Sequence, residues 1–169
     1  MKDKGIEYPY CRAYLDIETT GFNIYKHSIT VVGICLEKED KIFLQQFYGK
    51  GIQLDSILSV LCKADVLYTY NGKRFDLIFI ERKLGLDLSQ LCIHKDLMYE
   101  CWKKNLYGGL KNVEKLLGIS RNLNNMSGID AVYLWHNYCS KGCKESLKIL
   151  LEYNKEDVLN LIRLRRKLN

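Results

Sequence analysis

The first third of the chain has the hydrophobic and polar pattern of β-strands. Residues 12–18, 27–37 and 41–48 are rich in β-branched and aromatic side chains, which favour strands. The polar residues 38–40 suit a hairpin turn between the second and third of these segments. We therefore expect the three strands to form an antiparallel meander.

After residue 54 the spacing of apolar residues becomes that of amphipathic helices. Ile57, Leu58 and Leu61 recur at helical intervals within the segment 55–63. Further helices are expected over residues 73–85, 110–118, 130–140 and 143–168, and short strands over residues 65–70 and 92–98. The order of elements predicts one mixed five-stranded sheet, with three antiparallel strands and then parallel strands, flanked by helices in an α/β domain.

Composition narrows the class of protein. The length of 169 residues predicts a single domain over residues 1–169. No apolar run approaches the roughly 20 residues of a membrane span, and the N-terminus lacks the apolar core of a signal peptide. The seven cysteines are scattered without a CxxC pair, so we expect reduced cysteines in a cytoplasmic protein. A net charge of +6 is compatible with nucleic acid as a partner.

Two carboxylates in the first strand need an explanation. Side chains two positions apart on a strand point the same way, so Asp16 and Glu18 share one face with Tyr14, while the apolar residues between them share the other. At roughly 6 Å and an effective dielectric of about 20, two carboxylates repel by roughly 3 kcal/mol. A cation would offset that repulsion, and other parts of the chain should then supply further ligands.

Two later segments carry candidate partners. The sequence YNGKRFD places Asp76 in the first turn of a helix after the Asn71-Gly72 loop; taken alone, this position is explained equally well by the helix dipole. Tyr153 and Asp157 lie four residues apart on one face of the helix expected over residues 143–168. Taken alone, they read as a core aromatic residue and a solvated charge.

Together the three segments change the interpretation. The order DxE, NGxxFD and YxxxD resembles the three motifs of the DEDD superfamily of 3′-to-5′ exonucleases, which have the ribonuclease H-like fold, and the resemblance spans residues 14–157. One branch of that superfamily would have histidine at position 152, which here is Glu152, whereas Tyr153 matches the tyrosine (DEDDy) branch. Residues 110–119, 130–135 and 150–164 also resemble the YprB-like group of small RNase H-like predicted exonucleases.

The resemblance implies a ribonuclease H-like fold and a two-metal site. It implies two divalent cations, Mg²⁺ or Mn²⁺, with Asp16 bridging both and with Glu18 and Asp157 completing the first site. Asp76 would hold the second cation through water. Tyr153 would orient the attacking water, because a tyrosine with a pKa near 10 is a poor base at neutral pH.

The resemblance also implies where a nucleic acid would bind. The segment Thr19, Thr20, Gly21 and Phe22 would meet the terminal nucleotide, and Asn71 lies in the equivalent of a sugar-phosphate contact region. For Phe22, ordinary core packing remains an equal alternative.

We therefore expect a metal-dependent 3′-to-5′ exonuclease that hydrolyses phosphodiester bonds at the 3′ end of single-stranded RNA or DNA. One alternative is a catalytically silent nucleic-acid-binding module on the same fold. Another is an endonuclease of the RNase H type. The four carboxylates and the tyrosine favour an enzyme, and the NGxxFD and YxxxD motifs favour an exonuclease over an endonuclease. We expect no membrane association.

Overall fold

The first strand lies at the centre of a mixed five-stranded sheet. The structure, a computed structural model, describes residues 10–39 and 41–168. The strand order is β3-β2-β1-β4-β5, with β1, β2 and β3 antiparallel and with β4 and β5 parallel to β1. The strands are β1 (Cys11–Thr19), β2 (Ile29–Lys38), β3 (Lys41–Tyr48), β4 (Val66–Thr69) and β5 (Ile93–Asp96). The predicted α/β fold with a ribonuclease H-like mixed sheet is confirmed.

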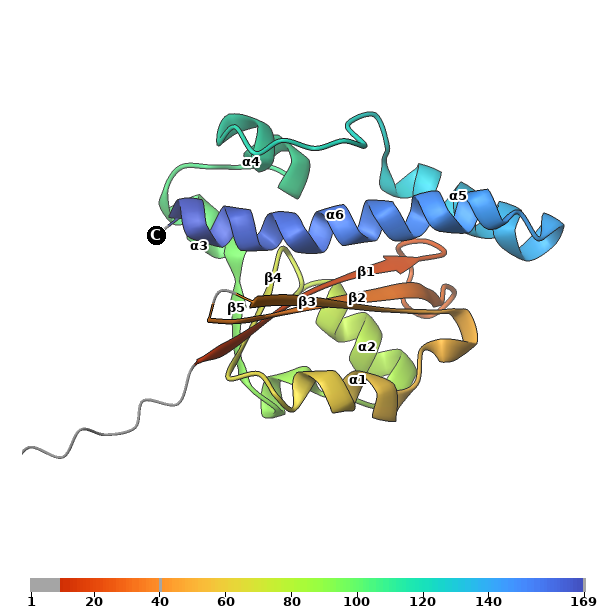
Figure 1. Cartoon of the computed structure of the whole chain (residues 1–169), viewed down its shortest axis with the longest axis horizontal. Coiled ribbons are helices and arrows are strands. Elements are labelled where there is room, and N and C mark those ends of the chain that lie inside the picture. Colours follow the sequence, from red (N-terminus) through yellow and green to blue (C-terminus); the bar gives the residue numbers. More distant parts are fainter. Residues whose placement is uncertain (1–9, 40, 169) are drawn as a thin grey trace, which may run out of the picture.

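Helices cover both faces of the sheet (Figure 1). On one face lie α1 (Leu54–Leu61) and α2 (Asp76–Leu84). The long helix α6 (Lys144–Leu168) crosses the other face, on the same side as α3 (Leu97–Lys103), α4 (Leu110–Leu116) and α5 (Gly128–Lys141). Two short 3₁₀ helices, Gly49–Gly51 and Leu88–Gln90, complete the described elements. None of the helices in residues 10–39 and 41–168 is long and apolar enough to cross a membrane.

Alternation along β1 divides its side chains between two cores. Leu15 and Ile17 pack with Phe79 of α2 and its neighbours. Tyr14 points to the other face and packs with Leu161 of α6. Asp16 and Glu18 follow Tyr14 on that second face, so β1 presents both carboxylates to the helical layer that contains α6.

Most predicted elements have the expected positions, and two differ. The helix expected over residues 73–85 begins only at Asp76, because the buried Asp96 carboxylate accepts hydrogen bonds from the amides of Asn71 and Lys73 and holds that stretch as a turn. Gly85 ends the helix with a φ of 69°, as predicted.

The strand expected over residues 92–98 was too long. It ends at Asp96, whose side chain also accepts from the amide of Met98 and so caps helix α3. The sequence analysis did not predict α3. In the hairpin turn expected over residues 38–40, Glu39 has a φ of 54°, and residue 40 lies outside the described residues.

The end of β1 is open on the side of β4. Only Arg12, Ala13 and Tyr14 pair with β4, so β1 continues beyond its parallel neighbour. The carboxyl ends of parallel strands are where ligands bind in open α/β sheets. On the β4 side, residues 16–19 therefore have no strand partner among the described residues, while β2 pairs with them on the other side.

A buried polar cluster fastens the end of α6 to the opposite end of β1. The Tyr14 hydroxyl donates to the Glu37 carboxylate at 2.6 Å and accepts from the Arg165 guanidinium. Arg165 and Arg166 both form ion pairs with Glu37, which is 3 % exposed. Several charged and hydroxyl donors offset the desolvation cost of this buried carboxylate, and removing one donor leaves part of that cost uncompensated.

We expect Tyr14→Phe to lower the free energy of unfolding by about 2 kcal/mol, because it removes a buried hydrogen bond to a charged acceptor. Urea denaturation measures this change, with Tyr133→Phe as the control at a solvent-exposed tyrosine. Equal stability of Tyr14→Phe and the control would show that the hydroxyl does not stabilise this cluster.

Candidate active site

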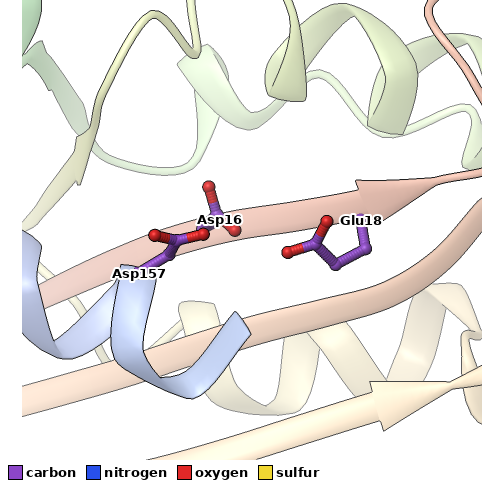
Figure 2. A group of neighbouring side chains, drawn as sticks. All are labelled: Asp16, Glu18 and Asp157. Carbon is purple, nitrogen blue, oxygen red and sulfur yellow. The ribbon is translucent and has the colours of Figure 1, made fainter. Parts of the chain in front are cut away.

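Three carboxylates converge beside the open end of β1. Asp16 and Glu18 come from the strand and Asp157 from α6, and Figure 2 shows the three side chains directed into a shared space. One carboxylate oxygen from each lies within 4.8 Å of those of the other two. Glu18 and Asp157 are each 7 % exposed. Asp157 is thus a neighbour in the fold of two strand residues that precede it by 139 and 141 positions in the sequence.

The fourth predicted carboxylate lies close by but has a different partner. Asp76 is the first residue of α2 and is buried. Its Oδ1 accepts a hydrogen bond of 3.0 Å from the backbone amide of Ile17. This residue lies beyond the part of β1 that pairs with β4. Asp76 therefore fastens the start of α2 to β1 between the two strand carboxylates, while remaining close enough to raise the pKa of both.

Burial makes the charged form of these groups costly. It raises the pKa of Asp16 and Glu18 well above the ordinary range, and the charge of Asp157 raises both further. Burial also raises the pKa of Asp76 to about 7, against the opposing hydrogen bond from Ile17. Such a cluster favours either protons or a cation.

The donor set fits a hard divalent cation. Three carboxylates within one ligand sphere supply only oxygen atoms, which suit Mg²⁺ and Mn²⁺ rather than the softer metals that prefer cysteine or histidine. Asp16, Glu18 and Asp157 are the residues that could hold such an ion directly.

A buried arginine also contacts the cluster. Arg121, in the loop after α4, donates two hydrogen bonds of 2.8 Å to Glu114 and a further one to Asp157. Asn160 of α6 donates to the same Glu114 carboxylate at 2.9 Å. Burial raises the pKa of Asp157 to about 6, and the Arg121 charge limits that rise. Arg121 thus keeps one side of the Asp157 carboxylate fixed.

The loop that carries Arg121 is held against α6 at a second point. Both oxygens of Glu156 accept backbone hydrogen bonds, from Asn122 and Leu123. Two adjacent residues of α6, Glu156 and Asp157, therefore bind this loop through side chains. The end of the same loop, at Met126 and Ser127, lines the cavity beside Asp16 and Asp157.

Tyr153 lines the cavity in front of the carboxylates. This cavity has a volume of about 370 Å³, and its lining includes Asp16, Asp157, Tyr70, Tyr153 and Lys111. The Lys111 ammonium lies 4.5 Å from the centre of the Tyr153 ring, a cation–π distance, and also donates to the carbonyl of Met126. Burial raises the pKa of Tyr153, which keeps its hydroxyl protonated.

The segment predicted to meet a nucleotide forms a tight loop after β1. The Thr19 hydroxyl donates to the Gly21 carbonyl at 2.8 Å, and the Thr20 hydroxyl accepts from the Ser28 amide at 3.0 Å. Gly21 has a φ of 151°, and a Cβ there would lie 2.7 Å from the His27 ring. Phe22 is 80 % exposed, which is not the exposure of a core residue.

Asn71, the other residue predicted to contact substrate, has a left-handed φ of 61°. Its backbone N–H donates to the Asp96 carboxylate at 2.8 Å. The contacts of the Thr19–Phe22 loop and of Asn71 with a substrate stay predictions.

Sequence reasoning missed the polar residues that hold the carboxylates in place. Arg121 stands in a loop without a motif, and Glu114 reads as a polar position of an amphipathic helix. Asn154 lies directly beside the motif residue Tyr153, but nothing in one sequence distinguishes it from a surface residue. The carboxylates that they contact are distant along the chain, 36 positions from Arg121 to Asp157 and 138 from Asn154 to Asp16, so no local pattern could have found them.

Comparison with known proteins agrees with this geometry. A sequence model described as the RNase_H superfamily matches residues 13–169. Comparison with curated proteins gave no match.

Several solved structures have the same fold. NrnC of Brucella melitensis bound to pGG is 20% identical, with 99% of this chain and 76% of that chain covered and a TM-score of 0.63. The same protein with bound Mg²⁺ is 22% identical, with the same coverage and a TM-score of 0.61. The zinc-bound complex of E. coli ExoI with single-stranded DNA is 16% identical, with 90% and 45% covered and a TM-score of 0.52. At these identities the likeness shows the fold, and the sequence match shows the family: the chain belongs to the RNase_H superfamily.

Proposed function

We propose that the protein is a metal-dependent 3′-to-5′ exonuclease of the tyrosine branch of the DEDD superfamily, acting on single-stranded nucleic acid. The convergence of Asp16, Glu18 and Asp157 within 4.8 Å carries the proposal, because a cation would offset the cost of keeping such a largely buried acidic cluster charged. Relatives of the same fold include NrnC with bound Mg²⁺ or pGG and ExoI with single-stranded DNA, which supports the same chemistry here.

Each residue has a definite task in this proposal. Asp16, Glu18 and Asp157 would bind divalent cations, with Asp76 close to the second position. Two bound cations would supply an activated water and would stabilise the leaving 3′-oxygen, as in other two-metal phosphodiesterases. The protonated Tyr153 hydroxyl would orient the attacking water by a hydrogen bond. Lys111, which lines the same cavity, would offer positive charge to the scissile phosphate.

A time course with 5′-labelled single-stranded RNA and DNA tests the proposal. We expect a ladder of products that shortens from the 3′ end in Mg²⁺ or Mn²⁺, and no products in chelator. The nucleic acid that is cleaved faster, RNA or DNA, identifies the substrate class. Internal fragments would instead indicate an RNase H-type endonuclease. Metal binding without any cleavage would indicate a silent binding module.

We expect Asp16→Asn to abolish hydrolysis while the domain stays folded. The change removes one charge of the metal ligand but keeps an oxygen that can accept from Asn154. It also relieves repulsion among buried carboxylates, so the metal-free variant should unfold at a higher temperature than the metal-free wild type at neutral pH. Cleavage at the wild-type rate would show that Asp16 is not a metal ligand in the reaction.

We expect Tyr153→Phe to slow turnover by about 10²-fold or more, the order expected for loss of a group that acts on a proton or positions a nucleophile. Mg²⁺ binding measured by calorimetry should be unchanged, because the hydroxyl is not a proposed ligand. Unchanged turnover would leave the ring with a packing role only.

The raised pKa values predict how stability depends on pH and metal. With folded values of about 7 for Asp76 and about 6 for Asp157 and unfolded values near 3.9, the folded state holds more protons than the unfolded chain between those limits. The free energy of unfolding of the metal-free protein should therefore fall as pH rises through this range.

Mg²⁺ should offset this loss, because it competes with protons for the same carboxylates. Thermal unfolding in chelator and in Mg²⁺ measures the effect. A free Mg²⁺ concentration of a hundred times the dissociation constant corresponds to an increase of about 2.7 kcal/mol in the free energy of unfolding. The stabilisation by Mg²⁺ should be larger at about pH 7.5 than at about pH 5. Equal stabilisation at both pH values would argue against binding at these carboxylates.

A further inference from the structure

A fully buried asparagine lies over the sheet beside the carboxylates. Asn154 follows Tyr153 on α6 and is 0 % exposed. A buried side-chain amide must satisfy two N–H donors and one carbonyl acceptor. Its partners therefore show why an amide, rather than an apolar side chain, occupies this position in the packing face of the helix.

The Asn154 amide connects two strands. Its Nδ2 donates to the Asp16 Oδ2 at 3.0 Å and to the Asp16 carbonyl oxygen at 3.2 Å. Its Oδ1 accepts a hydrogen bond of 2.9 Å from the Nε2 of Gln46, on β3. A continuous chain of hydrogen bonds thus runs from Gln46 through Asn154 to the carboxylate of Asp16.

The direction of this chain is fixed by a backbone carbonyl. The Nε2 of Gln46 also donates to the carbonyl oxygen of Leu151 at 2.8 Å, and a carbonyl can only accept. Gln46 must therefore present its NH₂ group to α6, and Asn154 must present its oxygen to Gln46. That leaves the NH₂ group of Asn154 directed at Asp16, as a carboxylate acceptor requires.

The sheet leaves space for this arrangement at one glycine. Gly33 of β2 pairs with Asp16 on one side and with Gln46 on the other, so the three residues form a row across three strands. A Cβ at position 33 would lie 2.2 Å from the Asn154 Oδ1 and 2.9 Å from the Val158 Cγ2. Only a glycine at the centre of the row lets the amide reach both ends of it.

We propose that Asn154, oriented by Gln46 above Gly33, is a positioning residue for metal binding. It occupies one oxygen of Asp16 from the side of α6 and fixes the rotamer of that carboxylate. The remaining lone pairs of Asp16 are thereby held toward Glu18 and Asp157 before a cation arrives. Hydrogen-bond partners of metal-binding carboxylates typically contribute 10- to 100-fold to metal affinity or activity. The proposal rests on the proposed function, in which Asp16 binds the metal.

Mg²⁺ binding measured by calorimetry tests this directly, together with the Mg²⁺ concentration required for half-maximal cleavage. We expect Asn154→Ala to weaken Mg²⁺ binding about 10- to 100-fold and to raise the Mg²⁺ requirement to match, with excess Mg²⁺ restoring part of the rate. A helix anchor without a role in positioning would change stability to urea but leave the Mg²⁺ affinity of the folded protein unchanged. That result would overturn the proposal.

Gln46→Leu provides a second variant that leaves both Asn154 and Asp16 in place. It removes the group that orients the amide, and its side chain is only half-buried on an edge strand, so the domain should fold even if Asn154→Ala does not. We expect weaker Mg²⁺ binding here too, whereas Gln45→Leu, at the exposed neighbouring position, should bind as the wild type does. Equal Mg²⁺ affinity of Gln46→Leu and Gln45→Leu would contradict the orienting role.

Mg²⁺ binding and cleavage by the wild-type protein distinguish failure of this inference from failure of the proposed function. Wild-type protein that binds no Mg²⁺ would overturn both. Wild-type protein that binds Mg²⁺ and cleaves, while the Asn154 and Gln46 variants bind equally well, would overturn only the positioning role.

Discussion

Repulsion between carboxylates that lie close together and largely buried at the end of β1 is the constraint around which the site is built. At about 5 Å and an effective dielectric of about 20, each pair of charges repels by roughly 3 kcal/mol, and burial adds the cost of desolvation. The protein offsets part of this with fixed donors: Asn154 donates to Asp16, Arg121 donates to Asp157, and a backbone amide of β1 donates to Asp76. The remaining negative charge is what a divalent cation would neutralise.

Several features of the scaffold follow from supplying those donors. β4 stops pairing at Tyr14, which frees the amide that Asp76 uses. Gly33 opens space above β2 for the Asn154 amide. The loop after α4 is bound to α6 through two adjacent carboxylates and thereby holds Arg121 against Asp157. Each of these features helps to fix the direction of a carboxylate, so the geometry of the site depends on the scaffold around it.

The sequence predicted the scaffold better than it predicted these supports. β-Branched and aromatic residues identified the strands. The resemblance of DxE, NGxxFD and YxxxD to the DEDD motifs grouped Asp16, Glu18, Asp76 and Asp157, and the structure brings the oxygens of Asp16, Glu18 and Asp157 together. Helix α3 was missed because the strand expected over residues 92–98 ran past the Asp96 cap into the first turn of the helix. Arg121 was missed because a side chain that acts through tertiary contacts leaves no periodic signal.

Anomalous X-ray diffraction from crystals grown with Mn²⁺ tests the central claim most directly, since it locates each ion independently of activity. The account predicts two anomalous peaks, with Asp16 contacting both ions, Glu18 and Asp157 contacting the first, and Asp76 beside the second. Peaks absent from this cluster, or ions held by other residues, would contradict it.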